Sequence, residues 1–194
     1  MLRQDRCLAR YLLWRTLLQA SRSAHAFLVV FALVRFSLGD RATGLFILAA
    51  EGSRLLAGVP CGWVTDHLGP RRGIVVVSCF SLMLAGIAVA TAWVTPAVAM
   101  AYVLFLLFGV FKAMWFSADS AMVLSLTTPD RHLRYVSLAL LVPLPVTLAA
   151  PVVTGYVAGR FGYAWAFMLS AALALAALIV AVSFRPSHPT EPTR

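Results

Sequence analysis

The sequence has 194 residues, of which 61% are hydrophobic and only 12% are charged, and its mean hydropathy is +0.88. Soluble domains carry about 25% charged residues, so this chain has too few to cover a water-soluble globule and we expect a lipid bilayer around it. The formal net charge of +9 does not indicate a nucleic-acid partner, because the basic residues lie mostly between apolar stretches and not along one face.

Six apolar stretches follow one another along the chain, each long enough to cross a bilayer. A helix rises about 1.5 Å per residue, so a hydrocarbon core of about 30 Å takes about 20 residues. The stretches do not alternate in polarity as barrel strands do, so we predict an all-α membrane protein, a six-transmembrane-helix bundle. The predicted spans are residues 12–36, 42–65, 73–93, 97–121, 135–158 and 163–184.

The basic residues predict how this bundle is oriented. If the N-terminus is cytoplasmic, ten of them fall on that side and three on the other, which is the bias expected of cytoplasmic loops. We therefore predict a multi-pass protein of the cell's inner (cytoplasmic) membrane with both termini inside. Residues 1–11 are predicted to be a cytoplasmic N-terminal segment and residues 185–194 a cytoplasmic tail, and both look like the chain's own ends.

The first polar motif is GWVTDHLGPRR, residues 62–72, which follows the second span. Its pattern G-x-V-x-D-x-x-G-x-R-R resembles the cytoplasmic loop signature of the major facilitator superfamily. The matching residues are Gly62, Asp66, Gly69, Arg71 and Arg72, whereas His67 and Pro70 depart from the signature. The resemblance implies glycines at close helix contacts. It also implies a latch that joins one half of the transporter to the other on the cytoplasmic side, with Asp66 as its acid and Arg71 and Arg72 as the basic partners. The alternative is a polar turn that only connects two helices.

A second resemblance to the same family covers TTPDRHLRYVSLALLVPLPVTLAAPVVTGYVAGRFGYAWAF, which is similar to the family's fifth or eleventh helix with its flanking turns. Pro151 and Gly155 match the antiporter signature there, but two other glycines are replaced, so an antiporter is not implied. Pro143, Pro145 and Pro151 each remove a backbone donor and bend a helix. They predict either a static kink near mid-depth or a moving hinge.

The resemblance extends over residues 12–184 and implies one six-helix half of a transporter. It implies a secondary active transporter, or a half-transporter subunit, that moves a small solute, alone or together with a coupling proton, by alternating access. The missing half would come from a second copy, as a homodimer, or from a separate chain. The alternative is a non-transporting integral membrane partner or regulator, or an inactive remnant.

Enzyme chemistry is not indicated. No nucleophile-elbow or H-E-x-x-H motif and no phosphate-cradling loop occurs in the sequence, and its three cysteines lack metal-ligand spacing. We therefore expect no enzyme, no cofactor and no metal.

Ionisable residues inside the first two spans are candidates for the substrate or ion pathway, because such residues are costly in lipid. By helical rise, Arg22 and Glu51 both lie near mid-depth, and His25 and Arg54 are one turn from them. One interpretation is a neutralising pair of Glu51 with Arg22 or Arg54. The others are that the excess positive charge binds an anionic substrate group, or that Glu51 and His25 carry protons.

The fourth span adds Lys112 and Asp119, which are seven residues apart and therefore lie on one face. Lys112 joins the pathway candidates, although its surroundings do not match the family's signature for this helix. Asp119 lies near the cytoplasmic edge, where we expect it either to meet Arg71 or Arg72 and extend the latch, or to serve as an interfacial anchor.

Overall fold

The computed structural model of the chain describes residues 6–39, 41–94, 98–127 and 132–184, and every element in these ranges is helical. The elements are α1 (Arg6–Arg22), the 3-10 helix η1 (Ser23–Ala26), α2 (Phe27–Phe36), α3 (Arg41–Leu68), α4 (Pro70–Trp93), α5 (Val98–Leu126), α6 (His132–Leu141), α7 (Leu144–Phe161) and α8 (Tyr163–Val182).

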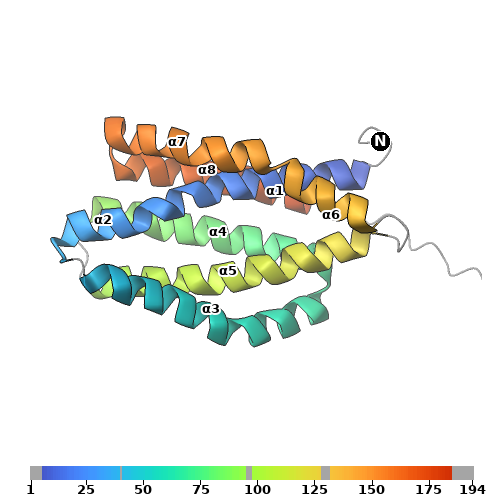
Figure 1. The fold of residues 1–194 in the computed structure, drawn as a ribbon, viewed down its shortest axis with the longest axis horizontal. Helices are drawn as coiled ribbons and strands as arrows, with labels where there is room; N and C mark the ends of the chain where they lie inside the picture. The colour runs from blue at the N-terminus through green and yellow to red at the C-terminus, as the bar shows by residue number, and fades with distance from the viewer. Residues whose placement is uncertain (1–5, 40, 95–97, 128–131, 185–194) are drawn as a thin grey trace, which may run out of the picture.

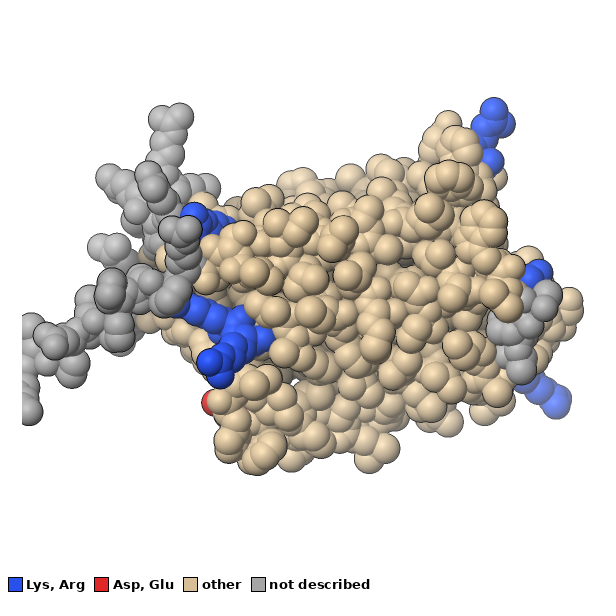
Figure 2. All heavy atoms as spheres, turned by 180° about the vertical axis from the view of Figure 1, so that it is seen from behind, with Lys and Arg blue, Asp and Glu red and all other residues tan. Residues whose placement is uncertain are grey.

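These elements form six segments long and apolar enough to cross a membrane: Cys7–Phe36, Arg41–Leu68, Pro70–Trp93, Val98–Leu126, Tyr135–Phe161 and Tyr163–Val182. The predicted all-α, six-span architecture is therefore confirmed. The helices extend beyond several predicted limits, since the first begins at Arg6 and the fourth span ends at Leu126. Figure 2 shows Lys and Arg side chains at the two ends of the molecule, with a wide belt of uncharged residues between them on this face.

The helices lie side by side in one bundle (Figure 1). α3 packs mainly against α5, α4 packs against α5 and α8, and α1 and α7 pack against α8. In the described part of the chain, α3 and the segment Tyr135–Phe161 are the least enclosed spans, with 11% of the most apolar window buried in each. Both α3 and α7 therefore leave most of their surface outside the bundle, and they lie at opposite edges of it in Figure 1.

Polar side chains between the helices are joined in pairs. Trp14 of α1 donates a hydrogen bond from Nε1 to Ser78 Oγ of α4 over 2.8 Å. Ser21 of α1 and Ser170 of α8 each donate from Oγ to the other's main-chain carbonyl oxygen, over 2.9 and 2.8 Å. Small residues that exchange hydrogen bonds let membrane helices approach closely, so these contacts fix α1 against α4 and α8.

The turn between α3 and α4 consists of Gly69 alone. Its φ of +78° is a backbone conformation that residues other than glycine rarely adopt. Pro70 then takes the first position of α4, where a missing backbone donor costs nothing. The loop-signature glycine and the proline that departs from the signature therefore both have a local conformational reason.

The fifth predicted span is broken, as its prolines suggested, but not at mid-depth. α6 ends at Leu141 and α7 begins at Leu144, only about a quarter of the way along the segment from Tyr135. Pro145 lies in the first turn of α7, and α7 continues as a helix through Pro151. Pro143 directly precedes α7, and its carbonyl oxygen accepts hydrogen bonds from Thr147 N and Oγ1 in the first turn of that helix.

The closest approach of α3 to α5 depends on a glycine. Gly109 of α5 is buried, and a Cβ at this position would overlap Ser53 Oγ and the carbonyl oxygen of Ala50 in α3. Ser53 in turn donates from Oγ to Leu106 O over 2.9 Å, which ties the two helices together at the same level. The family pattern did not single out this glycine.

We expect Gly109→Ala to lower the stability of the bundle by about 1–3 kcal/mol, because the added methyl group overpacks the contact between α3 and α5. Thermal unfolding of the detergent-purified protein, followed by tryptophan fluorescence, measures the change. Gly86→Ala in α4 is the matched control, because nothing lies within 4 Å of its added Cβ. Equal melting temperatures for the two variants would contradict this account of the contact.

Candidate functional site

The first span is interrupted at its middle by the 3-10 turn η1, which the sequence analysis did not predict. Ser23 Oγ donates to the carbonyl of Ala20 and shares a hydrogen bond of 2.7 Å with Thr154 Oγ1 of α7. Gly155 allows Phe27 to pack closely beside this contact, since an added Cβ would lie 3.1 Å from the phenyl ring. The turn is therefore held against α7. The serines at positions 21 and 23 are the sequence feature that could have indicated this contact.

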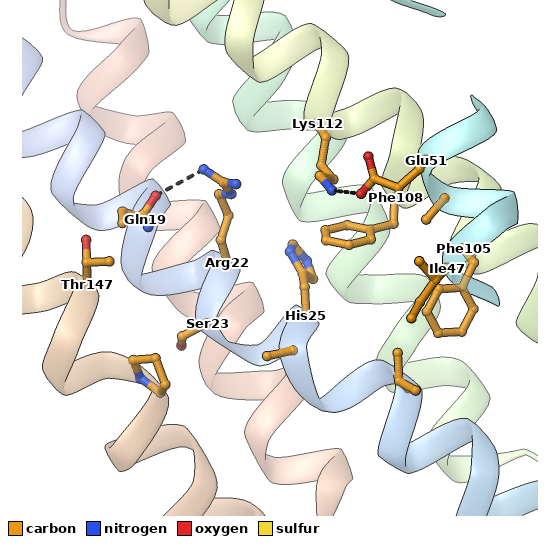
Figure 3. Close-up of a pocket in the computed structure, with 14 residues that line it drawn as sticks. Gln19, Arg22, Ser23, His25, Ile47, Glu51, Phe105, Phe108, Lys112 and Thr147 are labelled. Carbon is orange, nitrogen blue, oxygen red and sulfur yellow. Dashed lines mark hydrogen bonds and ion pairs between the residues drawn. The ribbon is translucent and has the colours of Figure 1, made fainter. Parts of the chain in front are cut away.

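A cavity of about 420 Å³ opens beside η1 (Figure 3). Its walls come from α1, η1, α2, α3, α5 and α7, so it lies between helices that are distant in sequence. Its polar lining residues are Gln19, Arg22, Ser23, His25, Glu51, Lys112 and Thr147, and its larger apolar ones are Val29, Ile47, Phe105, Phe108 and Pro151. The cavity thus contains four of the five pathway candidates.

Glu51 is the acidic residue of the cavity, and it is shared by two cations. Arg54 Nε lies 2.7 Å from Glu51 Oε2, and Lys112 of α5 bonds the other carboxylate oxygen (Figure 3). The predicted pairing of Glu51 with Arg54 is therefore present, whereas its alternative, Arg22, is not the partner. The sequence analysis did not pair Lys112 with Glu51, because it compared only the first two spans. Arg54 itself faces a neighbouring groove.

Arg22 has a different environment. Its guanidinium lies 3.9 Å from the centroid of the Trp115 ring and donates from Nη1 to Gln19 Oε1 over 3.0 Å. A stacked cation of this kind gains about 0.5–2 kcal/mol, which is less than the about 2.5–3.5 kcal/mol that a charge costs at mid-membrane. The stack alone therefore does not offset the burial of this charge.

His25 lies in the wall of the same cavity and is 4% exposed. Its ring centroid is 4.9 Å from that of Phe108 and 5.6 Å from that of Phe111. Neither ring nitrogen has a hydrogen-bond partner within the described residues. A buried polar group without a partner costs free energy, so this histidine has capacity for a further contact.

A second charged cluster joins α1 to α5. Tyr11 donates from its hydroxyl to Asp119 Oδ1 over 2.7 Å, Arg15 Nη2 lies 3.2 Å from Asp119 Oδ2, and Arg15 Nη1 donates to the Tyr11 hydroxyl over 3.1 Å. Asp119 is 8% exposed. The expectation that it meets Arg71 or Arg72 is therefore wrong. Arg15 is one of the ten basic residues assigned above to the cytoplasmic side, but its side chain lies inside the bundle and is 12% exposed.

The residues of the loop signature lie at the end of α3 and the start of α4. Asp66 is exposed and makes no hydrogen bond or ion pair within the described ranges. Together with Arg54 and Lys112, it lines a groove of about 520 Å³ between α3 and α5. Arg71 and Arg72 line a separate cavity that includes Cys7 and Met122. The structure therefore does not bring Asp66 and the two arginines together in one contact.

Gly62 also differs from the expectation of close helix contact. An added Cβ there would meet nothing within 4 Å among the described residues. A metal centre is not formed by the described part of the chain either, because no three His, Cys, Asp or Glu side chains gather in it.

A helical membrane protein with six spans and a polar, charged cavity between them is the class that these features define. The sequence profile of the Major Facilitator Superfamily matches residues 14–194, and the chain belongs to this superfamily of membrane transporters. Its six spans correspond to one six-helix half of such a transporter. No curated protein matches the chain.

We expect Asp119→Asn to lower the stability of the bundle by about 3–5 kcal/mol, because it leaves the buried Arg15 charge without its carboxylate. Arg15→Met should have a similar effect, and the double variant Arg15→Met, Asp119→Asn should cost less than the two single changes together. Thermal unfolding in detergent measures all three. Asp66→Asn is the control, since its carboxylate is exposed, and additive losses in the double variant would contradict the coupling.

Proposed function

We propose that this chain is half of a secondary active transporter, which moves a small solute across the cytoplasmic membrane by alternating access. The observation that carries the proposal is the charged cavity around Arg22, His25, Glu51 and Lys112. Arg22 is fifteen residues from the start of the segment Cys7–Phe36, or about 22 Å along it. The cavity therefore lies near mid-depth, where secondary transporters of this architecture bind their solutes.

A second six-helix half is part of this proposal. The side chains of Glu51 and Arg54 are 40% and 47% exposed, and in a bilayer these charges need a protein surface or water beside them, not lipid. The halves of such transporters are related by an axis along the membrane normal, with the solute between them. A second copy of this chain, as a homodimer, or a separate chain would complete the cavity.

We expect the purified chain in proteoliposomes to accumulate at least one labelled solute from a panel of amino acids, sugars and organic acids above the level in empty vesicles. Coupling to protons would make this uptake sensitive to a protonophore, and Glu51→Gln would then remove that sensitivity if Glu51 carries the proton. The mass of the particle in detergent, measured in parallel, reports whether two copies pair. A dimer without uptake of any solute would favour the alternative of a membrane partner or regulator.

The loop signature leads to a separate proposal, a cytoplasmic gate formed by Asp66 with Gly62, Gly69, Arg71 and Arg72. The support is its family pattern and the exposed Asp66 carboxylate, which is available to the other half. A carboxylate at the N-terminus of a facing helix gains about 0.3–1 kcal/mol, which is small enough to be broken and remade in each cycle. The proposal places both termini in the cytoplasm.

We expect Asp66→Asn to reduce the initial uptake rate severalfold without reducing the amount of protein in the membrane, because only the gate contact is lost. Immunoblotting of membranes and uptake by the same vesicles measure the two quantities. A cysteine introduced at position 66 of a cysteine-free chain should react with membrane-impermeant reagents from the cytoplasmic side only. Unchanged uptake by Asp66→Asn, or labelling from outside, would overturn the gate.

A further inference from the structure

We infer that the cavity binds an organic monoanion, with its charged group at Arg22 and its apolar body against Val29, Ile47 and Phe105. This inference rests on the proposed function and names the class of solute for the same cavity. It is carried by three observations that are independent of one another: the balance of charge, the polar groups left without partners, and the separation of polar and apolar lining.

The charge balance leaves Arg22 as the cation that an anion can neutralise. Two of the three described carboxylates lie near it along the bundle, and both are already engaged. Glu51 binds Lys112 and Arg54, and Asp119 binds Arg15. No carboxylate of the described residues lies within 4 Å of the Arg22 guanidinium. The lining of the cavity therefore favours a bound anion over a neutral molecule or a cation.

Two residues near Arg22 have buried polar atoms without partners in the described part of the chain. The Trp115 ring, on which Arg22 stacks, has its buried Nε1 donor unpaired within the described residues. Both nitrogens of His25, one turn from Arg22 in the chain, are also buried and unpaired. Buried polar atoms in folded proteins are nearly always bonded. Of these residues only His25 lines the cavity, so a ligand there with an acceptor oxygen would satisfy the N–H of the His25 ring, which the chain leaves unpaired.

Three of the larger apolar lining residues lie to one side of the charged residues, whereas Phe108 lies among them, with its ring centroid 5.6 Å from Lys112 Nζ. Val29 follows Arg22 by seven residues, whereas Ile47 and Phe105 precede Glu51 and Lys112 by four and seven residues. The first span runs opposite to the second and fourth, so all three apolar residues are displaced toward the same end of the bundle, by about 6–10 Å. Figure 3 shows Ile47 and Phe105 together on the side of the cavity away from the Gln19–Arg22 contact.

An anionic group and an apolar body therefore fit the two ends of one cavity of about 420 Å³. A guanidinium presents paired N–H donors that match the two oxygens of a carboxylate. A carboxylate with an aromatic or aliphatic body satisfies both ends, whereas a sugar would leave the apolar end against hydroxyl groups. A small inorganic anion would leave the apolar end empty.

The test uses benzoate and hexanoate as probes of the purified full chain in detergent, with tryptophan fluorescence as the readout, because Trp115 lies against Arg22. We expect saturable binding of at least one of the two, and at least tenfold weaker binding of benzamide and of acetate. Benzamide keeps the ring and removes the charge, whereas acetate keeps the charge and removes the body. Equilibrium dialysis with labelled probe measures the affinity of the unaltered chain independently of fluorescence, and Trp115→Phe shows how much of the fluorescence change comes from this ring among the five tryptophans.

Arg22→Gln should weaken binding of the anionic probe tenfold or more, and Arg22→Lys should weaken it less, because it keeps the charge but not the paired donors. Arg35→Gln is the matched control, since this exposed arginine of the same span makes its contact at Val94, outside the cavity. Equal affinity for benzoate and benzamide, no binding of either acid, or full affinity in a folded Arg22→Gln variant would each overturn the inference. Uptake of a neutral or cationic solute would do so while leaving the transporter proposal standing.

Discussion

The absence of water in the hydrocarbon core is the constraint on which the rest of this structure depends. A backbone amide there has to find its partner within the chain, and every described element is accordingly a helix. The same constraint applies to side chains, and several polar groups inside the bundle are paired across helices, such as Ser21 with Ser170 and Trp14 with Ser78.

Charged residues follow the same rule, and their distribution separates structural from functional groups. Asp119 has two partners in α1 and closes a compact cluster between helices. Glu51 has two cationic partners but remains open to the cavity. Arg22 has a ring and an amide instead of a carboxylate. A charge that the chain itself does not neutralise, at the depth where solute is expected, is the strongest pointer to function in this half.

Hydropathy and helical rise were sufficient to predict six helices and to bring Arg22, His25 and Glu51 to one level, because both depend only on sequence spacing. Partners across the bundle were harder to predict. The pairing of Lys112 with Glu51 depends on the contact of α3 with α5. This contact depends in turn on Gly109, which belongs to no recognised motif. Counting Arg15 with the cytoplasmic charges concealed it as a partner for Asp119, because spacing along one helix does not show which side chains of α1 face α5.

The single-glycine turns at Gly69 and Gly162 have a mechanical consequence. Each turn joins its two helices through one residue, so the connected ends of α3 and α4, and those of α7 and α8, have to move together. Within the described residues, the η1 turn and the break before α7 are therefore the places where we expect a rearrangement of this half to occur. A rocking motion that keeps both helical hairpins rigid therefore requires fewer hinge positions than a motion that bends every helix.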